Sequence, residues 1–267
     1  MGDIAKQFNC SRVYILLLLR KYGLAIRNKS VARAEAKKKG KNVGFSIINE
    51  NFFKNPTPEM AYVLSFIYSD GNIANALNYF SISQKEPEIL YKINELMSSE
   101  HPVVKRKNQE LYTITIGNRA MIRDLLDLGL TPNKSLDIKF PVLPENLNPH
   151  FIRGLFDGDG SIHFSKTWRV NFVSGSRGFL EVLENLLYDR IHVSKRPINT
   201  HSSGRAYEFS YFRIADLMKI YNYFYQSEVI QKEYLLQRKH EIFKKVFNWG
   251  EQVVAKNAIK RDRRYKL

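Results

Sequence analysis

Two acidic residues stand where each of two similar segments changes from an apolar run to a glycine. The segments are VLSFIYSDG at residues 63–71 and IRGLFDGDG at residues 152–160, and the acids are Asp70 and Asp159. A glycine after an apolar run is typical of a helix C-terminus, where the helix dipole repels negative charge. A pair of carboxylates in this position is favourable beside a divalent cation, so the pattern predicts a site for Mg²⁺.

The charge of the chain indicates what such a site would act on. The protein has 42 Lys and Arg against 26 Asp and Glu, a formal net charge of +16. This excess favours a polyanionic partner, and nucleic acid before others. A metal held by carboxylates beside a phosphodiester can generate a hydroxide and stabilise the leaving oxygen. The composition and the acids together predict metal-dependent chemistry on nucleic acid.

Other site classes and locations are disfavoured. Cys10 is the only cysteine and the histidines are scattered, which argues against a disulfide framework and a zinc site and favours a reducing compartment. No apolar run has the length of a membrane span, and the N-terminus lacks a signal peptide pattern. We therefore expect a location in the cytoplasm, or in an organelle matrix if the gene is organellar, and no membrane association.

The elements that precede the acids must bring them together. Gly154 and Gly158 are four residues apart and share one helix face, and Ser65 and Ser69 occupy the matching positions in the first segment. Such a stripe of small residues lets two helices approach closely, so we expect the two helices to pack on each other. Asp157 has no acidic counterpart, because Tyr68 stands in its place, and we expect it to be structural or solvent-facing rather than a metal ligand.

The same order of elements follows each acid, as in an internal repeat. Strand-like and helical periodicities alternate twice in the order helix-β-β-helix-β-β-helix, which predicts an α+β fold of two similar units. The strand-like segments are 77–84, 103–107 and 111–116 in the first copy, and 168–176, 192–196 and 206–212 in the second. The predicted domains are a basic helical module at 1–50, a first unit at 51–142, a second unit at 143–246 and a basic tail at 247–267.

These motifs resemble the LAGLIDADG homing endonucleases in the single-chain form with two motif copies. The second motif is close to the family pattern, whereas the first has Ser65, Tyr68 and Ser69 at positions where the family prefers small or acidic residues. The resemblance implies two four-stranded antiparallel sheets that form a saddle over the DNA major groove. It implies a monomer that cuts both strands of an asymmetric double-stranded DNA target, leaves short 3′ overhangs and serves intron homing.

The resemblance also assigns site residues. Asp70 and Asp159 would hold Mg²⁺, or Mn²⁺ as a substitute, together with Gly71 and Gly160. Gln84 matches a polar residue near the metal-bound water, whereas Ser174 stands at its partner position, so the two half-sites would differ. Lys134 and Lys232 are candidates for a lysine near the scissile phosphate, and either could be an ordinary exposed lysine.

The same resemblance places one face of each sheet against DNA, with Phe80, Ile82, Ile114 and Ile116 on the core face. The DNA-facing candidates of the first unit are Tyr79, Ser81, Ser83, Lys105, Lys107, Thr113 and Thr115. Those of the second unit are Arg169, Asn171, Lys195, Arg196, Arg205, Glu208 and Ser210. Each could instead belong to an ordinary solvated strand face.

The two ends of the chain add basic charge. Residues 3–24 have the rhythm of a helix-turn-helix with a cap at Ser11, which predicts a second DNA-binding module. The alternative is a basic helical hairpin that packs on the core. Residues 255–267 form a basic stretch that would contact phosphate or remain solvated.

Two functions of another class remain open at this stage. A protein of this kind could bind DNA as a regulator without cutting it, or could act on RNA as a maturase in intron splicing. The two intact acids argue against the regulator but do not exclude a maturase. A splicing intein is not expected, since the chain has neither an N-terminal Cys or Ser nor a C-terminal His-Asn pair.

Overall fold

The computed structural model describes most of the chain from Ile47 onward. The described residues are Gln7, Phe8, Leu19, Tyr22, 47–133, 137–225 and 234–264. The chain divides after Asn49 into a first part, Met1–Asn49, and a body, Glu50–Leu267. The predicted helix-turn-helix at 3–24 lies almost entirely outside the described residues and stays a prediction.

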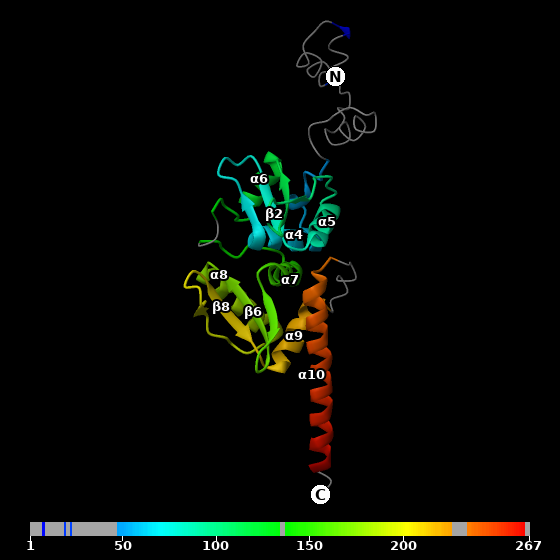
Figure 1. Cartoon of the computed structure of the whole chain (residues 1–267), viewed down its shortest axis with the longest axis vertical. Coiled ribbons are helices and arrows are strands. Elements are labelled where there is room, and N and C mark those ends of the chain that lie inside the picture. Colours follow the sequence, from blue (N-terminus) through cyan, green and yellow to red (C-terminus); the bar gives the residue numbers. More distant parts are fainter. Residues whose placement is uncertain are drawn as a thin grey trace. The chain divides into compact units, whose positions relative to one another are not determined.

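The body repeats one order of elements twice, as the periodicity predicts (Figure 1). After a short 3₁₀ helix η1 (Phe52–Lys54), the first unit contains α4 (Pro58–Asp70), β1 (Gly71–Ile73), β2 (Phe80–Gln84), α5 (Pro87–Leu96), β3 (Val104–Lys105), β4 (Tyr112–Ile116) and α6 (Arg119–Asp127). After η2 (Glu145–Leu147), the second unit contains α7 (Asn148–Gly158), β5 (Ser161–Phe164), β6 (Trp168–Ser174), α8 (Arg177–Ile191), β7 (Asn199–Thr200), β8 (Tyr207–Tyr211) and α9 (Ile214–Tyr225). A long helix α10 (Gln237–Arg264) follows.

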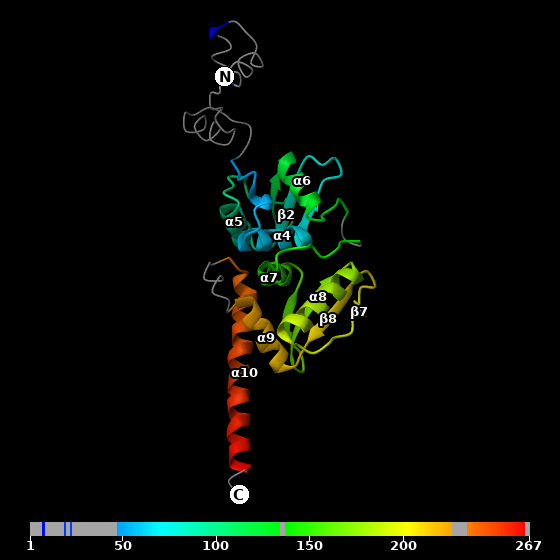
Figure 2. The same ribbon diagram turned by 180° about the vertical axis from the view of Figure 1, so that it is seen from behind.

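Each unit forms one antiparallel sheet of four strands. The strand orders are β1-β2-β4-β3 and β5-β6-β8-β7, and the registers correspond, since Phe80 pairs with Ile116 and Val170 with Tyr211. Helix α5 packs on β2 and β4, and α8 packs on β6 and β8, where Figure 2 shows it lying across β8. Alternation buries one face of each sheet under its helix and leaves the other face open, except at the buried residues Ser81 and Asn171.

The helices α4 and α7, which carry the two motifs, lie between the two sheets and pack on each other (Figure 1). A Cβ on Gly154 would collide with the Ser65 side chain and lie 2.8 Å from the carbonyl oxygen of Tyr62. A Cβ on Gly158 would lie 2.7 Å from the Cβ of Ser69. The small residues therefore meet in the order that the sequence predicts, and the predicted helix interface is confirmed.

The glycines that follow the acids are required by a close approach of the backbone. Neither Gly71 nor Gly160 has a positive φ. A Cβ on Gly71 would lie 2.5 Å from the Cα of Ile67, and one on Gly160 would lie 2.7 Å from the Cα of Phe156. In both units the chain leaves the helix folded back against its last turn, so the acid lies at a tight junction between helix and strand.

Two predicted segments are different in the structure. The predicted tail at 247–267 begins inside α10, because Phe243 and Val246 are buried and Gly250 lies against Met218 of α9. This apolar contact continues the helix across the predicted boundary. The strand predicted at 192–196 is instead irregular chain, and β7 begins only at Asn199, after α8 has ended at His192 with a φ of 54°.

None of the helices in the described part of the chain is both long enough and apolar enough to cross a membrane.

Candidate functional site

The two acids lie at the same end of the packed helix pair. Asp70 is the last residue of α4, and Asp159 is the C-cap of α7. A Cβ on Gly158 would lie 2.7 Å from Oδ2 of Asp70, so the Asp70 carboxylate reaches across to α7 beside the residue that precedes Asp159. The helix packing thus gathers two carboxylates from two units at one place, where neither unit alone has both.

Side chains of the first unit donate to the Asp70 carboxylate. Nε2 of Gln84, at the end of β2, donates to Oδ2 of Asp70 at 2.7 Å, and the Ser69 hydroxyl donates to the same oxygen at 3.0 Å. In the second unit Ser174 takes the place of Gln84, and its hydroxyl accepts a hydrogen bond from the backbone N–H of Ser176. The two half-sites therefore offer different neighbours to their acids.

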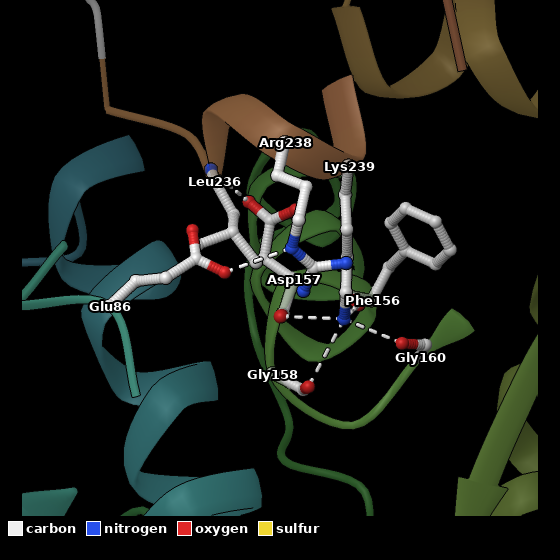
Figure 3. A network of polar contacts seen from close by, with 8 residues as sticks. All are labelled: Glu86, Phe156, Asp157, Gly158, Gly160, Leu236, Arg238 and Lys239. Atoms are coloured by element: carbon white, nitrogen blue, oxygen red, sulfur yellow. Dashed lines mark hydrogen bonds and ion pairs between the residues drawn. The ribbon is translucent and has the colours of Figure 1, made fainter. Parts of the chain in front are cut away.

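A buried lysine lies at the end of α7 (Figure 3). Nζ of Lys239, in the first turn of α10, donates to the carbonyl oxygens of Phe156 at 2.7 Å, Asp157 at 2.7 Å, Gly158 at 3.1 Å and Gly160 at 2.5 Å. The first three are carbonyls that a helix end leaves without partners, and Gly160 follows the C-cap of α7. The ammonium therefore places positive charge where the dipole of α7 is negative.

The electrostatic surroundings of Lys239 include both acids. Burial lowers the pKa of the Lys239 ammonium to about 8, while the Asp157 carboxylate and, more weakly, Asp70 and Asp159 act to raise it. Part of the repulsion between the two acids at the helix ends is thus offset by a side chain of the protein itself.

Neither lysine predicted to lie near the scissile phosphate is Lys239. Lys134 and Lys232 both lie outside the described residues, so their assignment stays a prediction. The sequence does not indicate Lys239, because its partners are backbone carbonyls and no side-chain spacing marks it. The lysine that the described structure brings to the acids comes from α10.

The acids fit a magnesium ion better than a metal with many protein ligands. Within the described ranges, no group of three or more His, Cys, Asp or Glu is placed to hold a metal. Mg²⁺ takes one or two carboxylates and completes its shell with water and substrate phosphate oxygens, which the pair Asp70 and Asp159 can offer. The predicted role of Gly71 and Gly160 as further metal ligands stays a prediction. The carbonyl of Gly160 already accepts a hydrogen bond from Lys239, and Gly71 is the first residue of β1.

Asp157 is structural, as the sequence predicts in one of its two alternatives. Its Oδ2 accepts hydrogen bonds from the Tyr62 hydroxyl at 2.7 Å and from the backbone N–H of Leu236 at 3.0 Å, and the residue is buried. Burial raises the pKa of the Asp157 carboxyl, and the hydrogen bond from Tyr62 and the nearby Arg153 act against this rise.

The open sheet face of the first unit carries a small polar network. The Ser83 and Thr113 hydroxyls are 2.9 Å apart, and Arg106 donates to both, through Nη2 to Ser83 at 3.3 Å and through Nε to Thr113 at 3.1 Å. Strand β3 ends at Lys105, so the alternation predicted over 103–107 does not hold beyond it. Lys107 lies in the β3–β4 turn, and Arg106, just before it, was missed. Among the other predicted residues of this face, Ser81 is buried. The exposed ones are Tyr79, Lys105, Lys107 and Thr115.

The open face of the second unit is partly paired within itself. Nδ2 of Asn171 donates to Glu208 at 2.7 Å, and the Ser210 hydroxyl donates to Oδ1 of Asn171 at 3.2 Å. Nε of Arg196 donates to the carbonyl of Ser210 at 2.7 Å, so Arg196 follows the edge of β8 although it lies in no strand. Arg205 is exposed in the β7–β8 turn.

Lys195 does not lie on this face. Its Nζ donates to Glu184 of α8 at 3.1 Å and lies 4.6 Å from the centre of the Tyr188 ring. The predicted DNA-facing position of Lys195 is wrong in this structure, because the segment before β7 is not a strand and does not alternate.

The sequence prediction of DNA-facing residues also missed an exposed aromatic ring. Phe212 follows β8, and the guanidinium carbons of Arg196 and Arg169 lie 4.3 Å and 5.5 Å from its ring centre. Its position continues the alternation of Glu208 and Ser210, which could have indicated it. The ring holds two guanidinium groups on the open face of the second sheet.

The second unit resembles a known family of domains. Residues 148–238 match the family described as a LAGLIDADG-like domain. The second unit is thus similar to a LAGLIDADG-like domain. The first unit repeats its order of elements and its sheet topology, and the resemblance inferred from the two motifs is confirmed.

Solved structures show that the fold of the body is that of LAGLIDADG endonucleases. A mutant of I-SmaMI matches with a TM-score of 0.53 and 13% identity, over 75% of this chain and 93% of that one. The LAGLIDADG meganuclease I-AabMI, bound to uncleaved DNA, matches with a TM-score of 0.52 and 12% identity, over 75% and 92% of the chains. I-SmaMI bound to uncleaveable DNA matches with a TM-score of 0.51 and 13% identity, over 75% and 92%.

A sequence relative has a different description. A probable translation initiation factor IF-2 of Methanocaldococcus jannaschii is 26% identical over 161 residues, which are 57% of this chain and 13% of that protein. The match thus covers a small part of the length of this relative.

Proposed function

We propose that this LAGLIDADG protein is a metal-dependent endonuclease that cuts both strands of a specific double-stranded DNA site. The observation that carries the proposal is the meeting of Asp70 and the end of α7 beside Asp159, one acid from each unit at one helix interface. The fold supports it, as do the DNA-bound states of I-AabMI and I-SmaMI.

Each residue of the site would have its own role in cleavage. Asp70 and Asp159 would hold Mg²⁺, which when bound supplies an activated water and stabilises the leaving oxygen. Gln84 and Ser69 orient the Asp70 carboxylate through its Oδ2. Lys239 fixes the end of α7 and offsets the negative charge of the two acids toward an incoming phosphate.

The two sheets would read the DNA. A curved antiparallel sheet can enter the major groove and present side chains to base edges. The open faces differ, with Ser83, Thr113 and Arg106 in the first unit and Arg169, Arg196 and Phe212 in the second. Unlike faces in one chain suit an asymmetric target read by a monomer.

One observation favours a second candidate, a DNA-binding protein of this fold that does not cut. The ammonium of Lys239 already gives the end of α7 a positive partner, so the acids do not depend on a metal alone for charge compensation. Such a protein would use the same sheets to recognise DNA and would retain Asp70 and Asp159 as structural residues.

Cleavage of a randomised double-stranded DNA library in Mg²⁺ tests the proposal. The wild type should select a site, and Asp70→Asn and Asp159→Asn should each lower cleavage by more than the roughly 10–100-fold that loss of an outer-shell metal partner costs. DNA binding should survive, since the sheets are unchanged. Asp189→Asn, an exposed acid of α8, is the matched control and should cut normally.

The outcomes separate the two candidates. Cleavage at the wild-type rate by both Asp70→Asn and Asp159→Asn would refute this active site. A wild type that binds a selected sequence but leaves it uncut in Mg²⁺ and in Mn²⁺ would establish the binding protein instead.

A further inference from the structure

A short segment brings Lys239 to the end of α7. We call residues 234–239 the strap. The side chain of Asp157 binds the strap, because Oδ2 of Asp157 accepts a hydrogen bond from the backbone N–H of Leu236 at 3.0 Å. The same oxygen accepts the Tyr62 hydroxyl of α4 at 2.7 Å. One buried carboxylate thus connects both motif helices to the strap.

The backbone of Leu236 transmits this contact to Lys239. The carbonyl of Leu236 accepts the backbone N–H groups of Lys239 at 3.0 Å and His240 at 3.1 Å, which begin α10. Nζ of Lys239 then returns to the carbonyl of Asp157 at 2.7 Å (Figure 3). Asp157, Leu236 and Lys239 form a closed ring of hydrogen bonds that starts from a carboxylate and ends on the backbone of the same residue.

Aromatic and ionic contacts support the strap from its sides. The Tyr234 ring lies 5.0 Å from the Tyr62 ring, and the Arg153 guanidinium lies 4.8 Å from Tyr62 and 5.0 Å from Tyr234. Arg238 pairs with Glu86 of the first unit at 3.0 Å. None of these contacts involves the backbone N–H of Leu236. This N–H, just before α10, is held by the side chain of Asp157.

The first unit makes a comparable connection with other chemistry. Tyr68 occupies the position that corresponds to Asp157, and its hydroxyl donates to the carbonyl of Leu128 at 2.6 Å, at the C-cap of α6. In both units this motif position ties the chain after the third helix to the motif helix. The acid is used where an N–H must be held, and the hydroxyl where a carbonyl must be held.

We propose that Asp157 is a positioning residue for Lys239, which it holds at the end of α7 through the backbone N–H and C=O groups of Leu236. The part played by Lys239 in cleavage rests on the proposed function, but its position does not. Asp157 thereby acts on the site from inside the protein without touching substrate.

Lysine acylation followed by mass spectrometry tests the position directly. Lys239 is 6% exposed, so wild-type protein should label slowly there. Asp157→Ala should label Lys239 roughly 10–100-fold faster, the change in opening that a lost hydrogen bond to a charged group corresponds to. Asp157→Asn keeps an acceptor oxygen and should stay close to wild type. The exposed Lys219 provides the internal reference and should label equally in all variants.

Two further variants keep the test valid if Asp157→Ala does not fold. Tyr62→Phe removes one of the two hydrogen bonds to the carboxylate and should increase labelling of Lys239 less than Asp157→Ala does. Tyr68→Phe is the matched control from the first unit and should leave Lys239 protected. Unchanged protection of Lys239 in both Asp157→Ala and Tyr62→Phe, with wild-type circular dichroism, would overturn the proposal.

Cleavage of the selected DNA adds the functional test. Asp157→Ala should lower the single-turnover rate roughly 10–100-fold, and should lower it no further when Lys239→Met is already present. Effects that multiply in the double variant would show that Asp157 acts by another route and would refute the positioning role. If the wild type does not cut, the proposed function fails, and the labelling result alone decides the proposal.

Discussion

Gly154→Ala tests the helix interface on which the whole site depends. The added Cβ would collide with Oγ of Ser65 and lie 2.8 Å from the carbonyl oxygen of Tyr62 and 3.0 Å from the Cβ of Ser65. A side chain can turn away, but the carbonyl belongs to the backbone of α4. The methyl group is therefore accommodated only if α4 and α7 move apart.

The magnitude follows from two opposed effects. In an exposed helix, replacing glycine by alanine stabilises by about 1 kcal/mol. Overpacking a buried contact costs about 1–3 kcal/mol, and here the contact with the Tyr62 carbonyl lies well below ordinary van der Waals distance. The cost therefore lies in the upper part of that range, and after the gain is subtracted we expect a net loss of about 1–2 kcal/mol, which in a domain of this size lowers the melting temperature by roughly 2–8 °C.

Thermal unfolding followed by circular dichroism measures this loss, with Gly178→Ala as the control. Gly178 also lies in a helix, but a Cβ there would meet nothing within 4 Å, so Gly178→Ala should be neutral or slightly stabilising. Ser65→Gly combined with Gly154→Ala should recover part of the loss, because it removes one of the two obstacles. Equal melting temperatures for Gly154→Ala, Gly178→Ala and the wild type would refute the interface.

Two further predictions concern acid stability and DNA recognition. His150 is buried, and burial together with Arg153 lowers its pKa to about 4, so the unfolded chain takes up a proton first as the pH falls from 6.5. Stability should fall by roughly 1–3 kcal/mol between pH 6.5 and pH 4 through this group, and urea unfolding of His150→Gln should show a shallower pH dependence; an identical slope would contradict this. Phe212→Ala removes the ring that holds Arg169 and Arg196, and should weaken DNA binding by about 1 kcal/mol with a looser base preference in selected sites. Unchanged affinity and unchanged preference would show that the stack does not contact DNA.

The amino-acid sequence by itself determined the repeated order of elements and the meeting of the motif helices. Gly154 and Gly158 face Ser65 and Ser69 as their spacing predicts, because the 3.6-residue period of a helix places residues four apart on one face. The buried Phe80, Ile82, Ile114 and Ile116 follow from the two-residue period of a strand. Periodicity is a local property, so these features can be read without knowledge of the folded chain.

Only the tertiary structure decided which groups surround the acids. Lys239 binds carbonyl oxygens, and Asp157 binds the N–H of Leu236, and every residue carries these backbone groups, so no pattern of side chains indicates the partners. The contact of α10 with α9, where Gly250 lies against Met218, is likewise long-range, and the residues around 250 do not indicate it by their own spacing. Lys195 turned to α8 for the same reason, because Glu184 meets it only after the chain has folded. Local spacing determined where the acids stand, and long-range contacts with the backbone determined how their helix ends are held.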